Sequence, residues 1–256
     1  MSSLLFDHPM VSHEKWEKFT KIEHRIWHIL FKRQTQLLKE RAANEMIDGI
    51  KKLRICNHQI PKFSELNEIL RRKTGFSIVP VKGFIPESLF LALLADRKFP
   101  VTCFIRSAQQ LDYLEEPDIF HDIFGHIPLL VNPIFADFMQ QFGLKGLQAI
   151  ELGMLRFAAA LYWFTVEFGL IKVNNNLRIY GAGISSSKGE SIYCLDSPLP
   201  TRVKFDLYEV IKTQYHINAF QKTYFVIESF QQLFDTVDKL NWQEVRANYL
   251  RLPEIK

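Results

Sequence analysis

A fifteen-residue apolar segment with one charge constrains this chain more than any other feature of its sequence. The segment covers residues 157–171 and reads FAAALYWFTVEFGLI, in which Glu167 is the only charged side chain. A buried ionised carboxylate without a partner costs several kcal/mol. The nearest basic residues, Arg156 and Lys172, lie eleven and five positions away, outside the steps at which helical side chains pair. Glu167 must therefore be protonated, paired with a distant arginine or bound to a metal ion, and the segment alone leaves these readings open.

Two histidines lie in a second apolar segment, residues 117–130, which reads PDIFHDIFGHIPLL. A regular helix turns about 100° per residue, so the five-residue step from His121 to His126 places the second side chain about 140° from the first. The imidazoles can meet only if the helix ends between them, and Gly125 and Pro128 predict that end. On that basis His121, His126 and Glu167 form a three-ligand site. Histidines that simply belong to the core are the alternative.

The ligand set indicates the class of metal. Two imidazoles and one carboxylate suit Fe(II), Zn(II) or Mn(II), and this set with open positions is typical of non-haem iron oxygenases. A zinc hydrolase is the competing reading, but the chain contains neither HExxH nor HxxEH. Cys56, Cys103 and Cys194 are odd in number and form no CxxC pair, so neither disulfides nor a thiolate metal site is expected.

Helical periodicity dominates the 256 residues, and the sequence predicts one mainly α domain with a few short β-strands. Gly75 and Gly143 are expected to stop the helices that precede them. We expect helices at residues 13–41, 42–55, 64–75, from 86 onward, and at 133–142, 147–170 and 229–240. We expect short strands at residues 77–85, 99–105, 177–180 and 191–195, and an apolar run at 224–227.

The charge distribution suggests an alternative function from a different class. The formal net charge is +4, but residues 14–73 contain 15 basic and 8 acidic side chains, which predicts a basic N-terminal surface. A basic helical nucleic-acid-binding domain with structural histidines is therefore the alternative, although such domains usually show denser basic clusters. The sequence shows no signal peptide or membrane-spanning segment, and a cytoplasmic protein is expected.

Four motifs resemble the pterin-dependent aromatic amino acid hydroxylase family, in matching order and spacing. They are FIRSAQQLDYLEEPD at 104–118, PDIFHDIFGHIPLL at 117–130, YWFTVEFGL at 162–170 and YGAGISSSKGE at 180–190. The resemblance implies a single catalytic domain over residues 1–256, without a separate regulatory domain. Its implied parts are a helical segment at 1–75, a core for iron, pterin and substrate at 76–230, and a C-terminal helix and tail at 231–256.

The resemblance also implies a role for individual residues. The iron ligands would be His121, His126 and Glu167. Substrate-binding residues are implied at five positions, namely Arg106, whose guanidinium suits a carboxylate, Leu114, Trp163, Gly183 and Ser186. Pterin-binding residues are implied at five more, namely Phe90 by stacking, Gly83 and Ile85 through the backbone, Tyr162, and Asp122 through water.

Some of these positions have simpler readings. Phe90 and Trp163 would suit an ordinary core, Gly183 a turn, and Arg106 a pair with a carboxylate of the fold. The chain also departs from animal members of the family at three positions, with Asp122 in place of Glu, Leu114 in place of Thr and Pro100 in place of His.

The implied reaction is the hydroxylation of L-phenylalanine to L-tyrosine, with O2 and a tetrahydropterin, tetrahydrobiopterin or a relative of it, at a non-haem Fe(II) centre. The implied role is phenylalanine catabolism and tyrosine formation. Ile217 falls where members that act on phenylalanine are apolar and those that act on tyrosine are acidic, which favours phenylalanine. Tryptophan or tyrosine as substrate is the alternative within the family. The expected partners are therefore phenylalanine and the pterin, without nucleic acid or membrane, in a monomer or small homo-oligomer.

Overall fold

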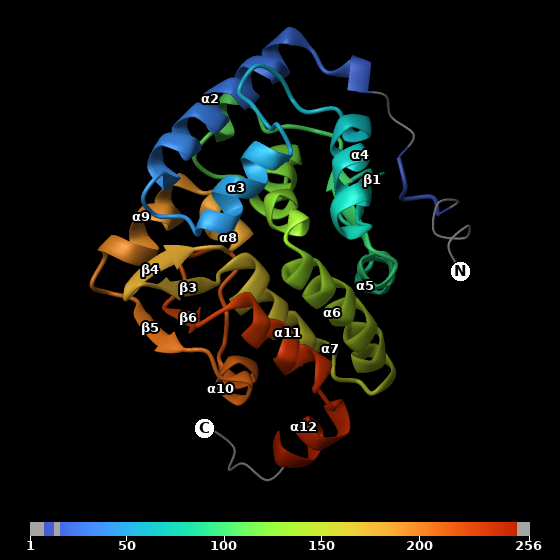
Figure 1. The fold of residues 1–256 in the computed structure, drawn as a ribbon, viewed down its shortest axis with the longest axis vertical. Coiled ribbons are helices and arrows are strands. Elements are labelled where there is room, and N and C mark those ends of the chain that lie inside the picture. The colour runs from blue at the N-terminus through green and yellow to red at the C-terminus, as the bar shows by residue number, and fades with distance from the viewer. Residues whose placement is uncertain (1–7, 13–15, 250–256) are drawn as a thin grey trace.

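Helices surround two small β-sheets in this computed structural model, which describes residues 8–12 and 16–249 (Figure 1). The α-helices are α2 Lys21–Leu38, α3 Asn44–Lys52, α4 Phe63–Thr74, α5 Glu87–Ala95, α6 Pro133–Glu151, α7 Leu155–Tyr162, α8 Ala182–Ser185, α9 Lys188–Asp196, α10 Leu207–Lys212, α11 Phe230–Asp238 and α12 Trp242–Tyr249. The strands are β1 Ser77–Val81, β2 Lys98–Thr102, β3 Leu170–Val173, β4 Asn176–Ile179, β5 Thr201–Lys204 and β6 Thr223–Ile227. The predicted mainly α fold with a few short strands is thus confirmed.

The strands form two separate sheets, one of two strands and one of four. Strands β1 and β2 pair in parallel, and the larger sheet has the order β4-β3-β6-β5. In it β3 is antiparallel to β4, while β6 is parallel to both β3 and β5. Figure 1 shows α2, α3 and α4 at one end of the long axis and α12 at the other. Within the described residues, no helix is both long and apolar enough to cross a bilayer.

Helix α2 begins later than the sequence pattern predicts. The Oγ1 of Thr20 accepts a hydrogen bond from the N–H of Glu23, and the Glu23 carboxylate accepts one from the N–H of Thr20. This reciprocal cap starts the helix at Lys21. Residues 13–15 of the predicted helix lie outside the described residues, and Trp16–Lys18 forms a short 3-10 turn. Helices α3 and α4 lie close to their predicted bounds, and Gly75, with φ of 77°, ends α4 as expected.

Helix α6 does not stop at Gly143, so that prediction is wrong. The helix continues to Glu151. A Cβ on Gly143 would overlap the backbone N of Ala95 and lie 2.7 Å from the carbonyl oxygen of Leu91. This glycine therefore allows α5 and α6 to pack backbone against backbone, and it does not end a helix.

The predicted helix at 147–170 is also wrong, because the chain breaks at Gly153. That residue has φ of 68°, which places it in the left-handed region between α6 and α7. Beyond α7 the residues up to Glu167 form a π-helical turn, and β3 follows. The predicted strand at 191–195 lies within α9, whose first turn is capped by the Ser187 hydroxyl. Strands β3 and β5 and helices α8, α10 and α12 were not predicted.

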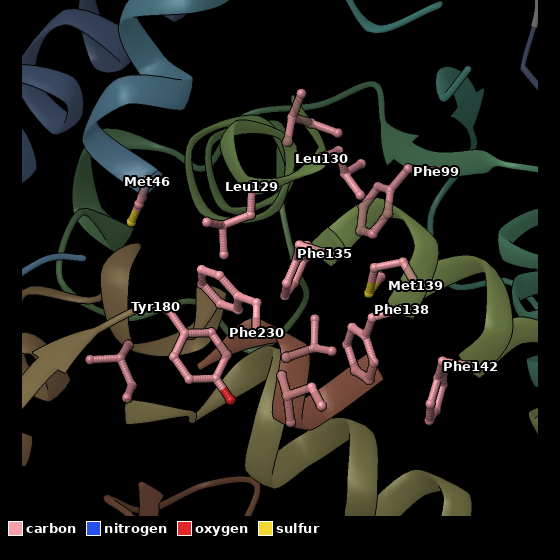
Figure 2. Close-up of a cluster of buried hydrophobic side chains, with 14 of the residues drawn as sticks. Met46, Phe99, Leu129, Leu130, Phe135, Phe138, Met139, Phe142, Tyr180 and Phe230 are labelled. Carbon is pink, nitrogen blue, oxygen red and sulfur yellow. The ribbon is translucent and has the colours of Figure 1, made fainter. Parts of the chain in front are cut away.

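One large cluster of buried side chains draws its members from Ile26 to Val245. Figure 2 shows part of it, with Phe135 and Phe138 from α6, Tyr180, and Phe230 from α11. The Phe230 ring meets the rings of Phe135 and Tyr180 edge to face. The predicted division at residues 75 and 230 stays a prediction, and residues 1–7, 13–15 and 250–256 lie outside the described residues.

We expect Gly143→Ala to lower the free energy of unfolding by about 1–3 kcal/mol, because its new methyl group meets the backbone of α5. In an unobstructed helix the same change would stabilise the protein by about 0.5–1 kcal/mol, so the sign of the effect is diagnostic. Urea unfolding measures it. Leu144→Ala, at the adjacent exposed position, is the matched control and should change stability by less than about 1 kcal/mol. A more stable Gly143→Ala protein would contradict the close contact of α5 and α6.

Candidate metal centre and substrate cavity

His121 and His126 lie on one π-helical segment, His121–His126. The N–H of Ile127 donates to the C=O of Asp122, five residues earlier, whereas an α-helix bonds residues four apart. The wider turn brings residues five positions apart to the same side, and the two imidazole centroids lie 4.8 Å apart. The predicted helix end between the histidines is therefore wrong. The chain continues without a break into the 3-10 turn Ile127–Val131.

Glu167 ends a second π-helical segment, Trp163–Glu167. There the N–H of Phe168 donates to the C=O of Trp163 over 2.8 Å, again across five residues. Isolated π turns occur often at functional sites. Each group of candidate ligands thus lies on a helix that widens locally.

Three glycines allow α8 to pack directly against both π-helical segments. A Cβ on Gly125 would lie 3.0 Å from that of Ala182, the first residue of α8. A Cβ on Gly181 would overlap the carbonyl oxygen of Glu167, and one on Gly183 would lie 2.9 Å from the ring of Phe168. Gly183, predicted to contact substrate or to serve a turn, is thus needed for close packing beside Glu167.

The three donors converge at one point. The Nε2 of His126 lies 3.0 Å from the Nε2 of His121 and 3.1 Å from an oxygen of Glu167, whose other oxygen lies 3.6 Å from His121. Two donors about 2.1 Å from a metal ion and at right angles to it are about 3.0 Å apart, so the spacing fits a divalent cation. Among the described residues, this is the one group of three or more His, Cys, Asp or Glu side chains that could hold a metal ion.

The protonation states of the cluster suit a cation. Burial raises the pKa of Glu167, but the nearby imidazoles of His126 and His121 outweigh this and leave the pKa below its usual value. Burial lowers the pKa of His121 to about 4. At neutral pH an ionised carboxylate therefore faces a neutral His121 imidazole.

Ser186 fixes the tautomer of His121. The Ser186 hydroxyl donates its proton to the carbonyl oxygen of Ala182, so its oxygen can accept one from the Nδ1–H of His121, 2.8 Å away. The Nε2 of His121 is then left as a bare acceptor that points at the cluster. The resemblance implied that Ser186 binds substrate. Its hydrogen bond to His121, a candidate metal ligand, was not predicted. The spacing of the motifs gave no signal for it.

All thirteen predicted site residues line one cavity of about 890 Å³, together with Ile217 and Pro100. They come from separate parts of the chain. Gly83, Ile85 and Phe90 lie on the side of β1 and α5, while Leu114 and Ile217 lie on irregular segments. The structure thus brings these thirteen residues to one cavity, and their individual roles stay predictions.

Arg106 already pairs with a carboxylate of the fold. Its Nε and Nη2 donate to the two oxygens of Asp118, each over 2.8 Å, and both side chains are buried. The simpler reading of Arg106 is therefore present in the structure. Because Arg106 also lines the cavity, the Nη1 side of its guanidinium is the part that could bind a substrate carboxylate.

Trp163 belongs to a hydrogen-bonded network that the sequence did not predict. Its ring stacks on Tyr215 at 4.9 Å, and its Nε1 donates to Gln221. The N–H of Gln221 and the hydroxyl of Tyr224 both donate to one oxygen of Glu190, which is 4% exposed. Burial raises the pKa of Glu190. The position of Glu190 in the motif YGAGISSSKGE was the one sequence signal for this network. Its hydrogen-bond partners could not be predicted, because they lie more than thirty positions away in the sequence.

Aromatic rings gather on the other side of the metal cluster. Phe90 meets Tyr162 edge to face at 5.3 Å, and Tyr162 stacks on His126 at 6.3 Å. Asp122 accepts hydrogen bonds from the N–H and hydroxyl of Thr102, and burial raises the pKa of this carboxyl to about 7. Thr102 was not predicted as part of the site. Phe90 is half-buried and borders the cavity, so a flat ring can reach it.

Comparison with known proteins places this chain in a known family and finds solved structures of similar fold. The family model described as biopterin-dependent aromatic amino acid hydroxylase matches residues 12–249. A phenylalanine-4-hydroxylase of Chromobacterium violaceum is 52% identical over 219 residues, which cover 86% of this chain and 74% of that protein. The cobalt-bound crystal structure of phenylalanine hydroxylase from that organism has a TM-score of 0.93 and 46% identity, and the match covers 96% of this chain and 88% of that one. Its structure with iron(III) and 7,8-dihydrobiopterin has a TM-score of 0.89 and 48% identity, with 94% and 86% covered.

We expect Ser186→Ala to weaken the binding of a divalent metal about 10- to 100-fold, because His121 loses the acceptor that fixes its tautomer. Titration of the metal-free protein with Fe(II) under anaerobic conditions, or with Co(II), measures the affinity. Ser185→Ala is the matched control, since the Ser185 hydroxyl bonds to the same carbonyl of Ala182 without touching His121. Equal affinities in the two variants would contradict the role of Ser186.

Proposed function

Since the chain belongs to the biopterin-dependent aromatic amino acid hydroxylases, we propose that it hydroxylates L-phenylalanine to L-tyrosine, with O2 and a tetrahydropterin as co-substrates at a non-haem Fe(II) centre. The observation that carries this proposal is the convergence of two imidazoles and one carboxylate at the wall of a cavity lined by aromatic side chains. The proposed metabolic role is phenylalanine breakdown with formation of tyrosine.

His121, His126 and Glu167 are the proposed iron ligands. Their donor atoms approach from two π-helical segments, and the partial exposure of His121 and Glu167 faces the cavity. When bound, the iron and the pterin would supply the activation of O2 and the transfer of one oxygen atom to the aromatic ring. The protein holds Glu167 ionised and His121 neutral, and the Ser186 oxygen accepts the Nδ1–H of His121.

The substrate would occupy the side of Arg106 and Trp163. The Nη1 edge of Arg106 would bind the carboxylate of the amino acid, while Asp118 holds the guanidinium in place. Trp163 and Leu114 would contact the aromatic ring, and Gly183 and Ser186 would lie beside the carboxylate. Apolar Ile217 at the cavity offers no partner to a phenolic hydroxyl, which supports phenylalanine over tyrosine as substrate.

The pterin would occupy the side of Phe90 and Tyr162. A flat pterin ring would stack on Phe90, with the backbone of Gly83 and Ile85 at its edge. Asp122, which also lines the cavity, would contact the pterin through a water molecule. These roles rest on the family resemblance together with the position of each residue at the cavity.

The remaining expectations concern partners and location. We propose that the protein acts as a monomer or small homo-oligomer in the cytoplasm, without a nucleic-acid partner. The convergence of the histidines with Glu167 argues against histidines that merely fill a core. Lys15, at the start of the basic region, lies outside the described residues.

We expect the purified protein to bind about one Fe(II) per chain and to form tyrosine only when phenylalanine, O2 and tetrahydropterin are all present. His121→Ala should lose both properties, because two donors hold the metal far less tightly than three. Metal analysis and chromatographic detection of tyrosine measure them. His28→Ala is the matched control, since His28 is an exposed histidine that bonds to the carbonyl of Asn57.

Two results would contradict this function. One is salt-sensitive binding of DNA or RNA by the metal-free protein, with the same affinity in the His126→Ala variant. The other is an iron-loaded protein that converts tryptophan or tyrosine in preference to phenylalanine.

A further inference from the structure

The cavity wall beside the substrate is an irregular loop. Residues 107–117, here called the substrate loop, contain one 3-10 turn, Ala108–Gln110, and no strand or α-helix. Residues 112–117 line the cavity, and Leu114 is among them. The side chain of Ser107 bonds only within the loop, to Gln110. A segment with so little internal structure needs an external contact to keep one conformation.

Arg33 on α2 provides that contact. Its Nη1 donates to the carboxylate of Asp112 over 2.6 Å, and its Nη2 donates to the carbonyl oxygen of Leu111 over 2.9 Å. These two hydrogen bonds join the substrate loop to a helix far away in the sequence. The Nε of Arg33 is buried without a partner, so the two bonds at the tip of the side chain must outweigh that cost.

The next residue on the same helix, Gln34, holds the segment that carries Ser186. The side chain of Gln34 is fully buried, and its Nε2 donates to the carbonyl oxygen of Ser185 over 2.7 Å. Ser186, which bonds to His121, follows directly. Consecutive residues of α2 therefore contact the substrate loop on one side and the segment beside the proposed iron ligand on the other.

We propose that Arg33 is a positioning residue for the amino acid substrate. By holding Leu111 and Asp112, it keeps the substrate loop in the conformation that presents Leu114 to the cavity. Without it, substrate binding has to order the loop as well, which weakens binding but leaves the saturated complex almost unchanged. This inference rests on the proposed function. The proposed pterin side lies along β1, the turn that follows it and α5, whereas these two hydrogen bonds of Arg33 reach only the substrate loop.

Steady-state kinetics of the iron-loaded enzyme test the proposal. Arg33→Ala should raise KM for phenylalanine about tenfold and leave kcat and KM for the pterin within about twofold. Arg41→Ala is the matched control. Arg41 follows the same helix, makes two hydrogen bonds to Asp196 over 2.7 and 2.9 Å, and does not line the cavity. It should leave all three constants unchanged.

Two further variants separate positioning from general destabilisation. Arg33→Lys keeps the ion pair with Asp112 but lacks the fork that also reaches Leu111, so it should restore part of the loss. Asp112→Asn leaves the bond to Leu111 intact, so it should raise KM less than Arg33→Ala. Adding it to Arg33→Ala should have no further effect, because both changes remove the same contact.

Hydrogen exchange gives a readout that needs neither iron nor turnover. In the metal-free protein, a peptide covering residues 107–117 should exchange faster in Arg33→Ala than in the wild type or Arg41→Ala. Unchanged exchange together with unchanged KM for phenylalanine would overturn the proposal, and so would an equal rise in KM for the pterin. A wild-type protein that forms no tyrosine would refute the proposed function, and the exchange experiment would still decide whether Arg33 anchors the loop.

Discussion

The structure depends on holding three candidate metal-binding atoms, from His121, His126 and Glu167, together in an apolar interior. With the Nδ1 of His121 protonated toward Ser186, its Nε2 is a bare acceptor that faces the Nε2 of His126 and an ionised Glu167. A divalent cation can bind all three of these donor atoms at once. The surrounding fold must therefore supply the energy that holds the donors close, and this requirement explains most of the unusual local structure nearby.

That energy comes from backbone packing more than from contacts between the ligands. His121 and His126 begin and end one π turn, and Glu167 ends the other. Helix α8 lies against both turns because Gly125, Gly181 and Gly183 carry no side chains there. The rings of Phe99 and Tyr162 cover His126 at 4.8 and 6.3 Å. Phe99 also belongs to the core cluster of Figure 2, so the metal centre borders the core directly. A well-packed core resists small displacements, and this rigidity keeps the donors at metal-binding distances.

From the sequence, the residues of the site were predicted better than the backbone conformation that brings them together. Glu167 was identified because its burial needs a partner, and the paired histidines because of their apolar neighbours. Their meeting was ascribed to a helix end at Gly125, since a π turn has no sequence signal of its own and shows only in the hydrogen bonds. Gly143 misled for a similar reason, because a glycine at a helix stop and one at a helix crossing look alike until the facing helix is known. The helix stop at Gly75 was predictable, because its N–H bonds to the carbonyl of Arg71, only four residues away.

The two sides of the cavity differ in how they are held, and this difference bears on how such an enzyme can change its substrate. The proposed pterin side takes Phe90 from α5, Pro100 from β2 and Tyr162 from α7, although Gly83 and Ile85 lie on the turn between β1 and α5. The substrate side uses the loop at 107–117 and the segment around Ile217, both tied down by a few hydrogen bonds. Regular elements that also support the iron ligands cannot shift without disturbing the metal, whereas loops can vary at little cost to the core. Selectivity among aromatic amino acids is therefore expected to reside in the loops, and Leu114, where this chain departs from animal members of the family, lies on one of them.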